Sequence, residues 1–144
     1  MYGFGDNMKL TQKDKKLIEM ASDLVKSNSD LYPPESPHVG AILLAKSGKV
    51  YKGINILTSH AICAEQVAIG QALACGEREF DTIVSVSLDS AGNTEVVSPC
   101  GVCRYLFDKL GKDLFIIVRD VENNINLKVK PGDLLPYRYE RAEE

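Results

Sequence analysis

Residues 83–118 read IVSVSLDSAGNTEVVSPCGVCRYLFDKLGKDLFIIV, and they predict the central unit of the fold. Residues 83–88 are rich in β-branched side chains and predict a strand, and residues 114–118 predict a second strand. Between them, residues 100–110 predict a helix that stops at Gly111. A helix that separates two strands in this way is the crossover that parallel strands require. We therefore expect a parallel pair of strands with this helix packed on one face.

The hydrophobic pattern on either side extends this unit to a complete sheet. It predicts a helix from Thr11, strands at 39–45 and 50–54, a helix at 61–75, a strand at 125–129 and a short helix from Pro131. The connection between residues 118 and 125 is too short for a crossover, so the last strand should run antiparallel to its neighbour. We predict an α/β fold, a three-layer α/β/α sandwich around a mixed five-stranded sheet.

Residues 1–144 have the size and composition of one domain, because 44% of the side chains are hydrophobic and no repeat or linker interrupts them. Thr11 and Asp14 have the spacing of a helix cap, with a hydroxyl followed three residues later by an acidic side chain. Residues 1–10 are expected to be mobile. Residues 31–37 contain three prolines and are expected to form a rigid loop.

Charge and composition argue against several classes of partner. The net charge is −3 and the sequence contains no basic stripe, so we expect no nucleic-acid partner. We expect no signal peptide and no membrane partner, because no run of about eighteen apolar residues occurs. A cytoplasmic location is therefore predicted. In that reducing compartment, four cysteines are better explained as ligands, nucleophiles or core residues than as disulfides.

Two short cysteine motifs carry the chemistry, Cys63-Ala64-Glu65 and Pro99-Cys100-Gly101-Val102-Cys103-Arg104. Each stands near the start of a predicted helix that follows a strand, so the two helix N-termini can converge at one end of the sheet. Three thiolates suit Zn²⁺ and leave one of its four positions open, as in a catalytic site. We predict a zinc centre held by Cys63, Cys100 and Cys103.

Two charged residues beside the cysteines fit such a centre. Glu65 stands two residues after Cys63, on a different side of the helix, where its carboxylate can exchange protons with water at the open position. Arg104 follows Cys103, and its cation can offset the negative charge of three thiolates. An ordinary surface ion pair is the alternative role for Arg104.

Other interpretations stay open for single residues. An isolated Cys-x-x-Cys fits half of a structural zinc site or a redox dithiol equally well. A non-catalytic zinc-stabilised binding module is a further alternative, although it has no use for Glu65. Cys75 stands at the end of a predicted helix and is expected to be a small core residue. His60 is expected either to reach the pocket or to be a surface or loop histidine.

With these motifs, the sequence resembles the cytidine deaminase family, including its blasticidin-S deaminase branch. The signature of a metal ligand, a glutamate and a later Pro-Cys-x-x-Cys is the general one of zinc deaminases. The resemblance spans most of the chain: Val39-Gly40-Ala41 is similar to the family's first strand, Gly53-Ile54-Asn55 to its second, and Leu134-Leu135-Pro136 to its closing segment. A cysteine as the first ligand favours enzymes of free nucleosides over those of polynucleotides.

The resemblance implies a Zn²⁺-dependent hydrolysis that replaces the exocyclic amine of a cytosine-like ring. It gives Glu65 the role of proton shuttle and Asn55 a contact with the sugar. The backbone around Ala64 and Ser98 would contact the ring and the departing ammonia. It further implies a homotetramer, or a homodimer, in which an aromatic residue such as Tyr137 or Tyr139 reaches a neighbouring subunit.

The departures from the family concern the substrate. Leu57 stands where cytidine deaminases usually have a glutamate that grips the ribose, and Pro37 where they have a ring-stacking phenylalanine. Gln66 stands where an arginine often follows the catalytic glutamate. A lost hydrogen bond to a carboxylate costs about 1.5–3 kcal/mol. These departures lean toward the blasticidin-S deaminase branch. Cytidine or deoxycytidine is the expected substrate from the family as a whole, and blasticidin S or another aminated base is the alternative.

Overall fold

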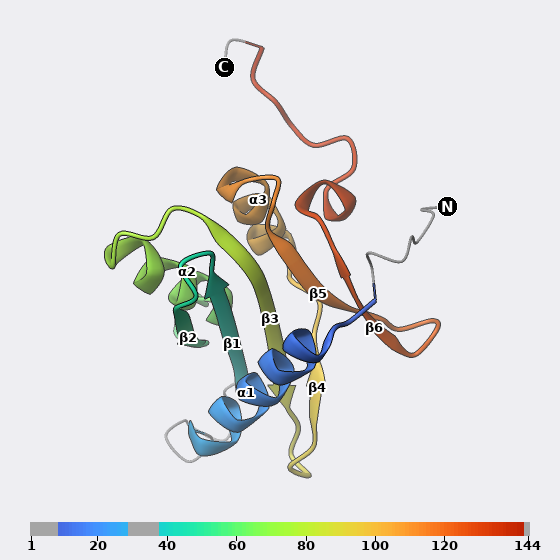
Figure 1. Cartoon of the computed structure of the whole chain (residues 1–144). Helices are drawn as coiled ribbons and strands as arrows, with labels where there is room; N and C mark the ends of the chain where they lie inside the picture. Colours follow the sequence, from blue (N-terminus) through green and yellow to red (C-terminus); the bar gives the residue numbers. More distant parts are fainter. Residues whose placement is uncertain (1–8, 29–37, 143–144) are drawn as a thin grey trace.

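The structure, a computed structural model, describes residues 9–28 and 38–142. In chain order its elements are α1 (Gln12–Asn28), β1 (His38–Ala45), β2 (Val50–Ile54), α2 (Ala64–Ala74), β3 (Phe80–Leu88), β4 (Thr94–Val96), α3 (Gly101–Leu110), β5 (Phe115–Asp120), β6 (Ile125–Val129) and a 3₁₀ helix, η3 (Pro131–Leu134). The strands form one mixed sheet in the order β2-β1-β3-β5-β6, and β4 pairs with β3 outside that path (Figure 1).

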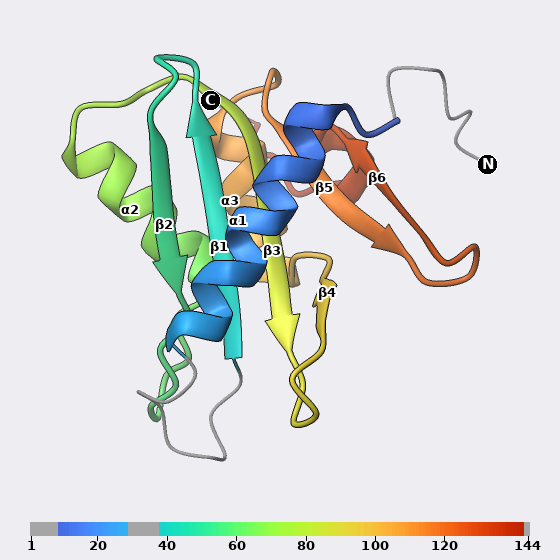
Figure 2. The ribbon, with the colours of Figure 1, turned by 60° about the horizontal axis from the view of Figure 1, so that its bottom comes forward.

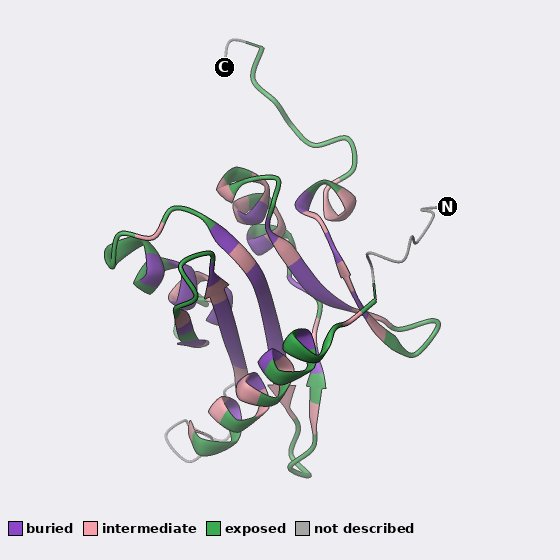
Figure 3. Cartoon of the chain, in the orientation of Figure 1, coloured by how far each residue is buried: buried purple, intermediate pink, exposed green. Residues whose placement is uncertain are grey.

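Helices cover both faces of the sheet, which confirms the predicted three-layer architecture. Figure 2 shows α1 crossing in front of the strands, with α2 and α3 on the opposite side. Strand β1 explains why both faces are covered, because its successive side chains point to opposite faces. Ile42 packs in the cluster under α1, whereas Ala41 and Leu43 pack in the cluster under α2 and α3. The central strands are accordingly buried along most of their length (Figure 3).

The strand directions confirm both predicted connections. Strands β3 and β5 are parallel, with Thr82 opposite Phe115, and α3 provides the crossover between them. Strand β6 pairs antiparallel to β5, from Ile116 opposite Val129 to Asp120 opposite Ile125. The parallel pairing covers only the beginning of β3 and β5, and the two strands then separate (Figures 1 and 2).

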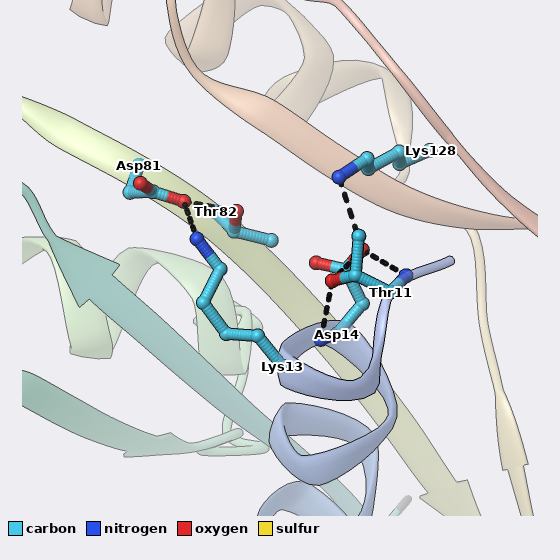
Figure 4. Close-up of polar contacts among 6 residues, drawn as sticks. All are labelled: Thr11, Lys13, Asp14, Asp81, Thr82 and Lys128. Atoms are coloured by element: carbon cyan, nitrogen blue, oxygen red, sulfur yellow. Dashed lines mark hydrogen bonds and ion pairs between the residues drawn. The ribbon is translucent and has the colours of Figure 1, made fainter. Parts of the chain in front are cut away.

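The predicted cap opens helix α1 and also ties it to the far edge of the sheet. Thr11 Oγ1 accepts the backbone N–H of Asp14 at 3.3 Å, and Asp14 Oδ2 accepts the N–H of Thr11 at 2.8 Å. The same carboxylate lies 3.0 Å from Lys128 Nζ on β6 (Figure 4). Because Asp14 is completely buried, the pair is shielded from solvent and fixes α1 across β3 and β5.

The structure corrects the sequence-based outline at several points. The sheet has six strands, because the short strand β4 follows the predicted turn at residues 90–93. Helix α2 begins at Ala64 and not at residue 61, because Ile62 pairs with Ile56 in an isolated antiparallel bridge. Cys75 is exposed, since it stands at the C-terminal end of α2 beyond the packed face.

Two predictions concern residues outside the described ranges. They are the mobile start, of which residues 1–8 are not described, and the rigid loop at residues 31–37, which includes Pro37. Within residues 9–28 and 38–142, no helix is both long and apolar enough to cross a membrane.

Candidate metal centre

The N-termini of α2 and α3 bring the two cysteine motifs together. Cys63 is the residue immediately before α2, and Cys100 is the residue immediately before α3; both have extended backbone conformations. Cys103 lies in the first turn of α3 and is completely buried. Both helices cover the same face of the sheet (Figure 2). Their first turns therefore meet at one end of it.

The three sulfur atoms have a spacing that suits zinc. The Sγ atoms of Cys63 and Cys100 lie 3.6 Å apart, and all three Sγ atoms lie within 4.8 Å of one another. Zn–S bonds of about 2.3 Å in a tetrahedron place two sulfurs about 3.8 Å apart. In the part of the chain that the structure describes, these cysteines form the one group of three or more Cys, His, Asp or Glu side chains able to hold a metal ion. The donor set fits Zn²⁺ and leaves a fourth position open.

The thiols have unequal tendencies to ionise. Burial raises the pKa of the Cys103 thiol, and repulsion from Glu65 and the other two cysteines adds to this. Burial also raises the pKa of Cys63. Burial opposes the charge on Cys100 too, but N–H groups of Cys103 and Val102 and the Cys63 thiol lower the pKa of its thiol. Three gathered thiols therefore resist ionising together, which is the condition that a divalent cation relieves.

Gly53 on β2 allows the first turn of α2 to approach the sheet. A Cβ atom on Gly53 would lie 2.1 Å from the carbonyl oxygen of Ala64 and 2.6 Å from the N of Ala68. Both neighbours are backbone atoms, so a side chain at this position would force the helix away. The position of Gly53 inside a predicted strand is the one sequence signal for this contact, because a glycine there can mark a close backbone approach.

A pocket of about 200 Å³ opens beside the cysteines. Its lining consists of Val39, Asn55, Leu57, Ala61, Ile62, Cys63, Ala64, Glu65, Val97, Ser98 and Cys100. The wall therefore contains two of the predicted metal ligands, the predicted proton shuttle and all three predicted substrate contacts. Glu65 is 6% exposed, so its carboxylate is nearly enclosed at the edge of this pocket.

Hydrogen bonds determine what Asn55 can offer to a ligand. The side-chain Oδ1 of Asn55 accepts the backbone N–H of Val39 at 2.9 Å, and the backbone N–H of Asn55 donates to the carbonyl of Val39 at 3.1 Å. Because a backbone donor occupies Oδ1, the side-chain NH₂ is the group of Asn55 that stays available as a donor. The expected contact of Asn55 with a sugar stays a prediction.

Ser98 lines the pocket, while its side chain is directed to β5. Its Oγ accepts the N–H of Arg119 at 3.1 Å and donates to the carbonyl of Arg119 at 3.2 Å. The hydroxyl is therefore occupied within the fold. The backbone of Ser98 is the part that remains for a ligand, and its contact with a substrate stays a prediction.

Arg104 contacts backbone carbonyls. Its Nε donates to the oxygen of Pro99 at 2.8 Å, and its Nη1 donates to that of Leu134 at 3.4 Å. These bonds link the residue before Cys100 to η3. The expected effect of Arg104 on the charge of the thiolates stays a prediction.

The remaining candidates lie apart from the pocket wall. His60 is exposed in the loop between Asn55 and Cys63, with Nδ1 3.4 Å from Ser59 Oγ. Tyr137 and Tyr139 are exposed on the C-terminal segment, which extends away from the sheet (Figure 1). Gln66 caps the N-terminus of α2, because its Oε1 accepts the backbone N–H of Cys63 at 3.0 Å.

Known proteins resemble the chain over most of its length. Residues 11–118 match the family described as "Cytidine and deoxycytidylate deaminase zinc-binding region". The "Blasticidin-S deaminase" of Bacillus cereus is 33% identical over 139 residues, which cover 92% of this chain and 96% of that one. A "Cytidine deaminase" of Sporosarcina psychrophila is 32% identical over 123 residues, covering 79% and 88%.

Solved structures agree with this assignment. The crystal structure of cytidine deaminase from Burkholderia pseudomallei has a TM-score of 0.66 at 30% identity and covers 90% of this chain and 100% of that one. The cytidine deaminase of Bacillus anthracis has a TM-score of 0.71 at 17% identity, covers 87% of this chain and 88% of that one, and supports the fold alone. The chain belongs to the cytidine and deoxycytidylate deaminase family and is a zinc-dependent deaminase that acts on a nucleoside or aminated base.

Proposed function

We propose that this protein hydrolyses the exocyclic amine of a free cytosine nucleoside, cytidine or deoxycytidine, and releases ammonia. The observation that carries the proposal is the position of Glu65, which is buried in the same pocket wall as Cys63 and Cys100. A purely structural zinc site has four protein ligands and needs no carboxylate beside an open position. A general acid–base group is what hydrolysis of an amine requires.

In the proposed reaction, water adds its oxygen to the ring carbon that carries the amine. Bound Zn²⁺ supplies Lewis acidity, which makes water acidic enough to react at neutral pH. Glu65 takes one proton of the water and delivers it to the ring nitrogen; it then takes the second proton from the hydroxyl now on the ring carbon and delivers it to the amine, which leaves as ammonia. The carbon–nitrogen bond breaks as the new carbonyl forms, and no redox partner is needed.

The other pocket residues would hold the nucleoside. The NH₂ group of Asn55 would donate to an oxygen of the sugar. The N–H of Ala64, at the start of α2, would hold the ring oxygen. The carbonyl of Ser98 would accept a hydrogen bond from the amine as it leaves. All three residues line the pocket.

Blasticidin S, a modified cytosine nucleoside, is a second candidate substrate. The observation that favours it is Leu57, which lines the pocket where cytidine deaminases usually have a glutamate. An aliphatic side chain cannot accept a hydrogen bond from a sugar hydroxyl, so the grip on an ordinary ribose would be weaker. The Bacillus cereus relative, named a blasticidin-S deaminase, is consistent with this alternative.

Ammonia release from the zinc-loaded protein tests both candidates. Cytidine, deoxycytidine, cytosine and blasticidin S should be compared at equal concentrations. Turnover of cytidine or deoxycytidine supports the main proposal, and turnover of blasticidin S alone supports the second. If none of the four is deaminated, the substrate lies outside simple cytosine derivatives.

We further propose a homotetramer, or a homodimer, in which Tyr137 or Tyr139 contacts a neighbouring subunit. The exposure of both rings on a segment that extends from the body supports this. Light scattering of the intact chain and of Tyr137→Ser and Tyr139→Ser variants would test it. A cytoplasmic location stays a prediction that cell fractionation can check.

A further inference from the structure

The segment that carries Ser98 and Cys100 crosses a gap in the sheet. Strands β3 and β5 pair only at Thr82–Phe115 and Ile83–Ile116, after which they separate. Strand β1 occupies the other edge of β3, so β4 pairs with β3 on the side that faces β5 (Figures 1 and 2). Residues 97–100 then run from β4 to the first turn of α3.

Backbone hydrogen bonds fix only one side of this segment. Val96 is in register with Val86 on β3, and the N–H of Val97 donates to the carbonyl of Ser85 at 3.0 Å. Strand β4 pairs with β3, and β5 pairs with β3 and β6, so no ladder between strands of the described chain joins β4 to β5. On the β5 side, a different set of contacts holds the segment in place.

Those contacts converge on Arg119 of β5. The main chain of Arg119 exchanges two hydrogen bonds with the hydroxyl of Ser98, at 3.1 and 3.2 Å. The side chain of the same arginine places Nε 2.6 Å from Oε1 of Glu95 on β4. Its Nη1 and Nη2 donate to Asn126 and Asn124 of the β5–β6 hairpin. Arg119 thus ties Ser98 of the segment and Glu95 of the preceding strand β4 to β5, and its side chain is itself oriented by the hairpin.

We propose that Ser98 and Arg119, with Glu95, form a staple that positions residues 97–100 for deamination. Arg119 is a positioning residue, because it acts through the segment and not by contact with the substrate. The staple sets the place of two groups at once: the Ser98 carbonyl, which would receive the departing amine, and Cys100, which holds the metal. This inference rests on the proposed function for the first group and on the metal centre for the second.

Replacement of Ser98 separates the hydroxyl from the size of the side chain. Ser98→Thr keeps the hydroxyl. Ser98→Val removes it, and the valine side chain has nearly the same volume as the threonine side chain. Loss of the two bonds should lower kcat per zinc-loaded site by about tenfold in Ser98→Val, with KM changed less than about threefold. Ser98→Thr should recover most of that loss. Asp113→Asn, which removes an exposed ion pair with Lys46, is the control for unspecific effects.

Arg119→Gln tests the second half of the staple. It should lower kcat by less than Ser98→Val, because the main-chain bonds to Ser98 persist. In the double variant the two losses should not multiply, because both substitutions loosen the same segment. Independent, multiplying losses would overturn the staple, and so would equal kcat values for Ser98→Val and Ser98→Thr.

Zinc release to a colorimetric chelator gives a readout that does not depend on turnover. With a looser Cys100, Ser98→Val should release zinc about tenfold faster than Ser98→Thr, at the same melting temperature. If the wild-type protein deaminates no cytosine compound, the proposed function fails, and the release rates alone decide on the staple. Equal release rates would overturn it. A faster release explained by a lowered melting temperature would reduce Ser98 to a purely structural role and would also overturn it.

Discussion

The Sγ atoms of Cys63 and Cys100 lie 3.6 Å apart, although 37 positions separate the two residues in sequence. The contact joins the residue before α2 to the residue before α3, so each helix contributes its N-terminal end to one metal centre. Cys75 lies at the other end of α2, about 18 Å from Cys63 at the rise of an α-helix. This separation makes Cys75 a natural control for the ligand set.

Substitution of a single ligand should remove the metal. We expect Cys100→Ser to retain less than about a tenth of the zinc of the wild-type protein after dialysis against a chelator, because a serine hydroxyl is a poor ligand for Zn²⁺. Cys75→Ser should retain its full zinc content. Elemental analysis of both variants measures the difference, and equal zinc in the two would refute the three-cysteine site.

Replacement of Glu65 by glutamine should stop catalysis without releasing zinc. A general acid–base group contributes about 10²–10⁴-fold to the rate, and Glu65→Gln keeps the volume of the buried side chain while removing the titrating group. Ammonia release and zinc content should be measured on the same sample. Glu79→Gln, at an exposed position, is the matched control. Persistent turnover in zinc-loaded Glu65→Gln would show that another group moves the proton.

Leu57 should set the preference between ordinary and modified cytosine nucleosides. Leu57→Glu introduces an acceptor for a sugar hydroxyl, and a hydrogen bond to a charged group contributes about 1.5–3 kcal/mol. We therefore expect kcat/KM for cytidine to rise at least about tenfold relative to that for blasticidin S. Leu57→Gln should give a smaller change, since its acceptor is uncharged. An unchanged ratio in both variants would remove Leu57 from the determinants of specificity.

The close approach of β2 and α2 should make Gly53 intolerant of a side chain. A Cβ atom 2.1 Å from a backbone oxygen must displace the helix, so Gly53→Ala should destabilise the fold and weaken zinc binding. Gly70 lies on α2 with open space around it, so Gly70→Ala should be neutral or should stabilise the fold by up to about 1 kcal/mol. Chemical denaturation of both variants gives the comparison. A Gly53→Ala variant as stable as Gly70→Ala would contradict the packing described here.

A contact between residues far apart in sequence also holds helix α1 in place. Asp14 is buried against Lys128 of β6, whereas the neighbouring pair of Lys13 and Asp81 is partly exposed (Figure 4). Removing one partner of a buried pair leaves an uncompensated charge, while exposed pairs contribute little. The cap at Thr11 was predictable from local spacing, but its link to β6 depends on how the layers pack.

The features that depend on local pattern could be predicted from the amino-acid sequence. Hydrophobic periodicity and glycine positions predicted the helices and five strands, and connection length predicted the parallel and antiparallel pairings. The spacing of Cys63, Glu65, Cys100 and Cys103 predicted the zinc centre, because helices that follow strands begin at one end of a sheet. These inferences need no knowledge of distant contacts.

The other features became visible in the folded structure, because they depend on which surfaces of the helices and strands meet. The divergence of β3 from β5 leaves a gap for β4, a strand too short to be recognised from its own sequence. The contact between Gly53 and α2 and the bonds of Arg119 to Ser98 and Glu95 join segments with no local relationship. Sequence periodicity indicates which face of a helix or strand is buried, whereas these contacts depend on the register and the distance between packed helices and strands.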